Sequence, residues 1–142
     1  MAKPLIELCV EGIDGFLAAQ DAGADRVELC ASLMEGGLTP SLATIRAAVK
    51  AARIPVHVII RPRGGDFLYS QAEFETMVED IKALPVAKAC EETAHLYLWV
   101  PNALLPQGLD VMRAWGFQYK ANIVWHKVRK DGGPDGRGVG FY

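Results

Sequence analysis

Alternating strand-like and helix-like segments constrain this fold more than any other feature of the sequence. The segments 5–10, 25–31 and 54–63 have the apolar alternation of β-strands, and helical spacing of apolar residues follows each of them. Two later segments, 95–100 and 119–127, predict further strands with a helix between them. Strands that alternate with helices are typical of a parallel sheet with helical crossovers. We therefore expect an α/β fold with about five parallel strands.

Two of the expected helices carry their own start signals. Thr39 as an N-cap, followed by Pro40 at the first helical position, predicts where the second helix begins. Ser70 and Glu73 match the capping-box pattern and predict that the third helix begins there. The apolar stripe of this third helix should face the core, and Ile81 within it is expected to be buried.

Composition excludes several classes of protein. The net charge of −2 gives no general affinity for nucleic acid or for an anionic membrane. No apolar run approaches the ~20 residues of a membrane-spanning helix, and the N-terminus lacks a signal-peptide layout. Cys9, Cys30 and Cys90 form neither a CxxC pair nor the even count of a disulfide scaffold. The cytoplasm is therefore the expected compartment, and neither nucleic acid nor a membrane is an expected partner.

Parity along the first three strands separates two faces of the expected sheet. Side chains alternate between faces along a strand, and one face is wholly apolar here, so it should pack under the helices. The other face carries polar and sulfur-bearing side chains: Glu7, Cys9, Glu28, Cys30, His57, Arg61 and Arg63. Ligand sites of parallel α/β folds lie at the carboxyl ends of strands. This second face is therefore the candidate site.

The cysteine pair on this face has two interpretations. Cys9 and Cys30 lie at similar places on neighbouring strands, so their sulfurs could approach one another and bind Cu(I), a soft ion that prefers sulfur ligands. They could instead be two small buried hydrophobic residues, because free cysteine is commonly buried.

The charged residues on the same face are equally open to two interpretations. Glu7, Glu28, Arg61 and Arg63 could form a constellation that binds a small anion or a metal ion. They could also form a structural layer of salt bridges inside a barrel. His57 is more typical of a hydrogen-bonded core histidine than of a metal ligand.

The phrases "ADRVELCASLMEGGLTPS" and "IPVHVIIRPRGGDFLYS" closely resemble the N-terminal part of CutC, the copper-homeostasis family. The resemblance covers roughly residues 4–82. That family is a (β/α)8 barrel associated with copper tolerance and handling. The resemblance therefore implies three TIM-barrel-type βα units over residues 1–82, with copper as the expected bound ion.

The second half of the chain resembles a different family. The phrases "AHLYLWVPNALLPQGLDVMRAWGFQYKANIVWHK" and "KDGGPDGRGVGFY" are similar to a segment of the MT-A70 adenine-specific methyltransferases, over roughly residues 76–142. This implies a Rossmann-methyltransferase-type βαβ unit over residues 83–142. The Asp-Pro-Pro-Trp catalytic signature of that family does not occur in the sequence, so S-adenosylmethionine is not an expected cofactor. Lys127 and Arg137 could contact a cofactor or nucleic acid, or could simply belong to a solvated charged loop.

The two resemblances overlap around residues 76–83, which indicates a chimera joined within one helix, by recombination or by design. We expect the halves to form one compact unit with a half-barrel or flavodoxin-like sheet, whose open edges a homo-oligomer could cover. Three functions follow. The favoured one is a CutC-like copper-binding module without catalytic activity. The alternatives are a methyltransferase remnant that binds cofactor or nucleic acid, and a structural chimera with no biochemical activity.

Overall fold

The computed structural model describes residues 4–123, and the chain divides into two compact units, Met1–Ala94 and His95–Tyr142. The boundary between these units follows Ala94, which is 12 residues beyond the predicted join at residue 82. The end of the third helix and the connection after it therefore belong to the first unit. That the two units unfold together as one remains a prediction.

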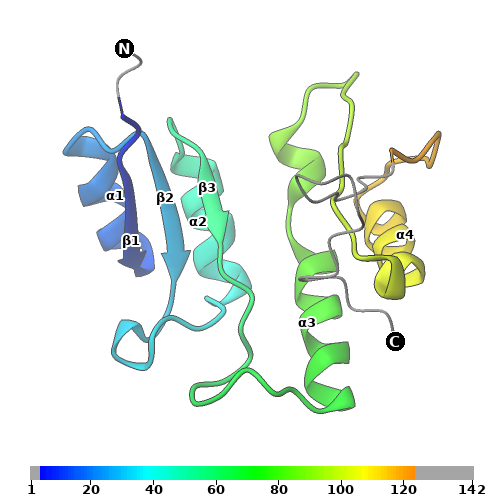
Figure 1. Ribbon diagram of the computed structural model, residues 1–142. Helices are drawn as coiled ribbons and strands as arrows, with labels where there is room; N and C mark the ends of the chain where they lie inside the picture. Colours follow the sequence, from blue (N-terminus) through cyan, green and yellow to red (C-terminus); the bar gives the residue numbers. More distant parts are fainter. Residues whose placement is uncertain (1–3, 124–142) are drawn as a thin grey trace, which may run out of the picture. The chain divides into compact units, whose positions relative to one another are not determined.

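A parallel sheet in the order β1–β2–β3 organises the first unit (Figure 1). Its strands are β1 (Glu7–Glu11), β2 (Arg26–Cys30) and β3 (Val56–Val58), each shorter than its predicted segment. Helix α1 (Gly12–Asp21) packs on β1 and β2, while α2 (Leu42–Ala51) packs on α1 and β3. The three consecutive βα units expected from the sequence are therefore present.

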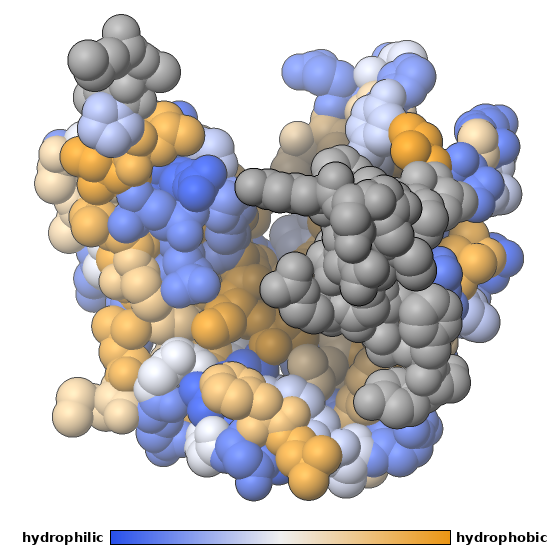
Figure 2. Space-filling view, in the orientation of Figure 1, coloured by the Kyte–Doolittle hydropathy of each residue, from blue (hydrophilic) through white to orange (hydrophobic). Residues whose placement is uncertain are grey.

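The core of this unit lies between the two helices and the apolar face of the sheet. Phe16, Val27 and Leu29 are fully buried there. Leu8 belongs to the same face but is 39% exposed, because β1 is an edge strand with a neighbour on one side only. Figure 2 shows hydrophobic side chains at the N-terminal end of this unit, where Leu5 and Ile6 precede β1 and are exposed.

The predicted start of α2 is wrong by two residues. Ser41, not Thr39, is the N-cap, and its hydroxyl accepts a hydrogen bond from the Thr44 backbone nitrogen at 3.2 Å. The Thr39 side chain has a different partner. It accepts from the Arg61 backbone nitrogen at 2.8 Å and donates to the Arg61 carbonyl at 3.1 Å. Thr39 therefore bonds to the backbone after β3 and does not cap α2.

Helix α3 (Gln71–Ala83) begins with the predicted capping box. Ser70 accepts from the Glu73 backbone nitrogen at 3.2 Å, and the Glu73 carboxylate accepts from the Ser70 backbone nitrogen at 2.7 Å. The prediction that Ile81 is buried is wrong, because Ile81 is half-buried and no residue of α3 is fully buried. Leu84, directly after the helix, is the residue that packs against the core around Phe16.

The second unit contains the predicted helix, here α4 (Leu105–Ala114), with Gly108, Val111 and Met112 buried. The predicted strand 95–100 is not formed, and residues 119–123 of the last predicted strand are also irregular. Residues 124–127 lie outside the described part of the chain. The described residues thus have three strands instead of five, because neither segment makes the ladder of hydrogen bonds that defines a strand.

None of the helices within residues 4–123 combines the length and the apolar character needed to cross a membrane.

Candidate functional site

The two strand cysteines are neighbours. The Sγ atoms of Cys9 and Cys30 lie 3.9 Å apart, and the Cys30 thiol also donates to the Val10 carbonyl at 3.3 Å. The contact is diagonal, because Cys9 stands opposite Glu28 in the register and Cys30 stands opposite Glu11. Cys9 is exposed, whereas Cys30 is fully buried. The site therefore has one open and one covered sulfur.

Both thiols are held in the protonated form. The Glu28 carboxylate, which is hydrogen-bonded to the Cys9 thiol, raises the pKa of Cys9 to about 12, and burial and the neighbouring Cys30 add to this effect. Burial is the main reason why the pKa of Cys30 is raised as well. A metal ion that binds here must displace protons, so its affinity will increase with pH.

Replacing Glu28 by glutamine should therefore lower the pKa of Cys9 and make it more reactive. Each unit by which the pKa falls gives about tenfold more thiolate. The accompanying loss of intrinsic nucleophilicity is about threefold per unit, so the net gain is about threefold per unit. The pH dependence of Cys9 alkylation by iodoacetamide, in a Cys30→Ser, Cys90→Ser background, measures this shift. The matched control is Glu75→Gln on α3. An unchanged pH profile in Glu28→Gln would show that Glu28 does not set the Cys9 pKa.

Glu7 on β1 contacts one basic side chain on each of the other two strands. Its carboxylate forms an ion pair with Arg26 and lies 3.2 Å from Nδ1 of His57. His57 is therefore a partly exposed partner of a carboxylate and not a core histidine as expected. The partners of Glu7 are therefore Arg26 and His57, and not Arg61 and Arg63, with which it was predicted to cluster.

Arg61 is buried, and its guanidinium contacts main-chain carbonyls. Nη1 donates to Glu35 at 2.8 Å and to Gly37 at 3.3 Å, while Nη2 donates to Gly65 at 2.9 Å. The ring of Phe67 lies against the guanidinium, 4.8 Å from its central carbon. Both Nη atoms therefore donate to the protein itself, which favours a structural role for Arg61 over the binding of a ligand.

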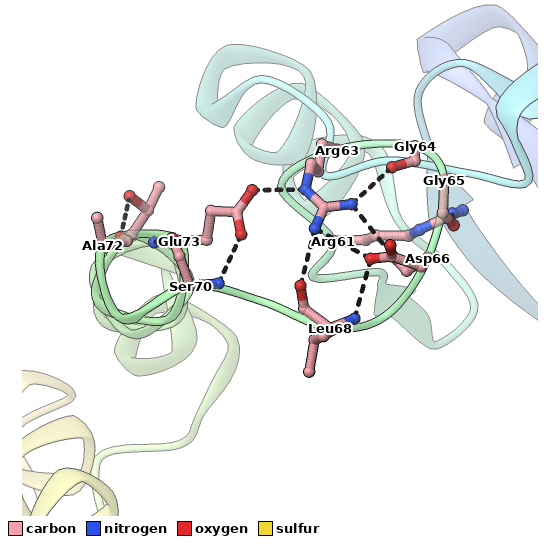
Figure 3. Close-up of polar contacts among 10 residues, drawn as sticks. Arg61, Arg63, Gly64, Gly65, Asp66, Leu68, Ser70, Ala72 and Glu73 are labelled. Atoms are coloured by element: carbon pink, nitrogen blue, oxygen red, sulfur yellow. Dashed lines mark hydrogen bonds and ion pairs between the residues drawn. The ribbon is translucent and has the colours of Figure 1, made fainter.

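Arg63 is similarly engaged by the loop that follows it (Figure 3). Its Nε lies 2.5 Å from the Glu73 carboxylate, and Nη2 lies 3.1 Å from that of Asp66. Further donors reach the carbonyls of Gly64 and Leu68. The hydrogen bond from the Ser70 backbone and the charge of Arg63 together lower the pKa of Glu73. Arg63 thus connects the loop to the first turn of α3.

The site that remains from the predicted constellation consists of Cys9, Cys30 and Glu28. Within residues 4–123 no group of three or more His, Cys, Asp or Glu side chains is arranged to hold a metal ion, so the two sulfurs are the candidate ligands. Lys127 and Arg137 lie outside the described residues.

Gly37, a buried residue beside Cys30, was not predicted to belong to the site, although the "EGG" phrase offered a signal for a special backbone conformation.

Comparison with known proteins gives two family matches. The CutC family model matches residues 4–92, and the MT-A70 model matches residues 57–137. A CutC family protein from Mesorhizobium japonicum is 70% identical over 81 residues, which cover 57% of this chain and 31% of that protein. A CutC family protein from Sodalis glossinidius is 54% identical over 78 residues, which cover 55% of this chain and 31% of that protein. The chain thus spans about a third of the length of these curated relatives.

A solved structure supports the same assignment. The crystal structure of a protein from Streptococcus agalactiae that bears the name copper homeostasis protein CutC matches with a TM-score of 0.54 at 28% identity. The match covers 81% of this chain and 70% of that protein. Because each family model matches more than half of the sequence, the chain belongs to the CutC family through its N-terminal part and to the MT-A70 family through its C-terminal part.

Proposed function

We propose that the chain binds Cu(I) through Cys9 and Cys30, as a copper-homeostasis module of the CutC type. The observation that carries this proposal is the distance of 3.9 Å between the two sulfurs. One ion with metal–sulfur bonds of about 2.3 Å can contact two sulfurs at this separation. Thiolates are soft ligands that suit Cu(I), and copper homeostasis is the role named for the Streptococcus agalactiae relative.

The surroundings of the sulfurs favour a metal ion over an anion. Cys9 is exposed and offers a point of entry, while the negative charge of the Glu28 carboxylate next to it attracts a cation and repels an anion. The Nη donors of Arg61 and Arg63 are engaged by carbonyls and carboxylates of the protein. We therefore do not propose the small anionic ligand as a partner.

Titration with Cu(I) against a competing chelator tests this function. We expect one equivalent to bind, and Cys9→Ser or Cys30→Ser to weaken the affinity about 100-fold or more, since loss of outer partners alone costs 10–100-fold. Cys90→Ser is the matched control, because Cys90 does not belong to the pair, and it should bind as the wild type does. Equal affinity in the Cys9→Ser, Cys30→Ser double variant would refute the proposal.

The match to the MT-A70 family supports a second candidate, a remnant that contacts S-adenosylmethionine or nucleic acid. Methyl transfer requires the adenine amino group to be held in line with the methyl donor. The sequence lacks the Asp-Pro-Pro-Trp signature expected to position that group, so we propose no catalysis. Transfer of labelled methyl groups to DNA above background would contradict this view.

The cytoplasm is the compartment that we propose for this function. All three cysteines, Cys9, Cys30 and Cys90, are free thiols. Free thiols suit a reducing compartment, where thiolate sites for copper persist.

A further inference from the structure

The turn that follows β2 lies directly on the buried sulfur of the pair. Gly37 in this turn is buried, and a Cβ atom at that position would lie 3.3 Å from the Cys30 Cβ and 3.6 Å from its Sγ. Hydrogen bonds of 2.9 and 2.7 Å between Ala31 and Leu38 close the base of the turn. The backbone at Gly37 therefore forms part of the cover that leaves Cys30 with 0% exposure.

The same turn is also held by the side chain of Arg61. The Nη1 atom donates to the carbonyls of Glu35 and Gly37, at 2.8 and 3.3 Å, and Nη2 donates to Gly65 in the loop after β3. Arg61 is 7% exposed, so these bonds are shielded from water. One side chain thus fixes the cover of Cys30 to the loop that follows the next strand.

The geometry requires arginine and not merely a positive charge. A planar guanidinium can donate from two nitrogens in fixed directions, whereas a lysine ammonium is a compact charge without such a fork. Phe67 lies over the guanidinium at 4.8 Å, and Thr39 holds the backbone of Arg61 through two hydrogen bonds of its side chain. Phe67 and Thr39 therefore help to hold the Arg61 guanidinium in the orientation in which it donates to the turn.

We propose that Arg61 is a positioning residue that latches the turn 35–37 over Cys30 and so limits access to the buried thiol. When the latch opens, Cys30 meets solvent and can react with a metal ion or with a small thiol reagent. Opening of this kind is a local event that leaves the core around Phe16 intact. The latch does not depend on copper. If the cysteine pair does bind Cu(I), the latch also sets how fast the second sulfur becomes available.

Alkylation of Cys30 alone measures the latch directly. In the full chain with Cys9→Ser and Cys90→Ser, the rate of reaction with iodoacetamide at fixed pH reports exposure of Cys30. Arg61→Lys keeps the charge but removes the fork, and we expect it to raise the rate about tenfold or more, as loss of a hydrogen bond from a charged donor should. The matched control is Arg53→Lys, an exposed arginine paired with Asp21, which should leave the rate unchanged.

A second variant keeps the test decisive if Arg61→Lys disturbs the fold. Phe67→Leu removes the ring over the guanidinium without touching the turn, and Phe67 is 73% exposed, so the fold does not depend on it. We expect Phe67→Leu to raise the rate of Cys30 alkylation as well, but by less than Arg61→Lys does. If both variants react at the rate of the Cys9→Ser, Cys90→Ser chain, with unchanged circular dichroism, the latch is overturned. Faster alkylation in Arg61→Lys, combined with no Cu(I) binding by the chain that retains all three cysteines, would support the latch and refute the copper proposal, so the two failures are distinguishable.

Discussion

Replacing Phe16 by alanine is expected to destabilise the first unit by about 3–5 kcal/mol. Phe16 is 0% exposed and packs among Val27, Leu29, Ile45 and Ala48 between the two helices and the sheet. Its loss leaves a cavity that small neighbours such as Ala48 cannot fill. A domain of this size has a total stability of only ~5–15 kcal/mol. Thermal unfolding followed by circular dichroism should therefore begin more than about 10 °C lower.

The control lies at the next position of the same helix. Leu17→Ala removes a large side chain that is already 36% exposed, so it should cost much less than Phe16→Ala. Equal effects of the two changes would show that the core is not where the structure places it. All three tryptophans occur after residue 94. A tryptophan midpoint that falls together with that of circular dichroism in Phe16→Ala would also confirm that the two units unfold as one.

Replacing Gly108 by alanine should destabilise the second unit, although alanine is the better helix former. In α4 a Cβ at position 108 would lie 2.6 and 2.9 Å from the two methyl carbons of Val100. Overpacking of this kind costs about 1–3 kcal/mol. The gain in helix propensity from Gly to Ala is about 1 kcal/mol, so the steric cost should prevail. Tryptophan fluorescence during denaturation measures the result.

Shortening the opposing side chain should reverse this effect. In the Val100→Ala, Gly108→Ala double variant the methyl carbons that would be too close are gone, so stability should recover beyond the sum of the two single changes. The matched control is Gly116→Ala, where a Cβ would meet nothing within 4 Å but φ is +83°. Its cost should come from backbone strain and should not respond to Val100→Ala. Additive effects at positions 100 and 108 would contradict the contact.

Parity and strand alternation predicted the three strands of the first unit and the sulfur pair on one of their faces. Because side chains alternate strictly along a strand, Cys9 and Cys30 were expected on one face, and their 3.9 Å contact confirms this. The diagonal register, with Cys9 opposite Glu28, could not be predicted, since it depends on how the strands slide against each other. Nor does parity reveal that Arg61 contacts the carbonyls of a turn more than 20 residues earlier in the sequence.

The missing strands show where local pattern is insufficient. The segment 95–100 has the apolar and aromatic residues typical of strands, yet in the structure it is irregular. Strand formation needs a second strand to complete the hydrogen bonds, and a sequence pattern cannot supply that partner. The capping box at Ser70 was predictable for the opposite reason, because all its bonds join residues three positions apart.

The capping box of α3 has a consequence for how this helix tolerates changes of sequence. The bonds of the capping box join Ser70 and Glu73, and Arg63 contacts Glu73 from the preceding loop, so all three residues lie at or before the first turn of the helix. Both family matches include the whole helix. These start signals remain intact whichever sequence continues after the first turn. The later turns contain no fully buried side chain, so sequence changes there should disturb the core of the first unit less than a change at Leu84, which packs against it.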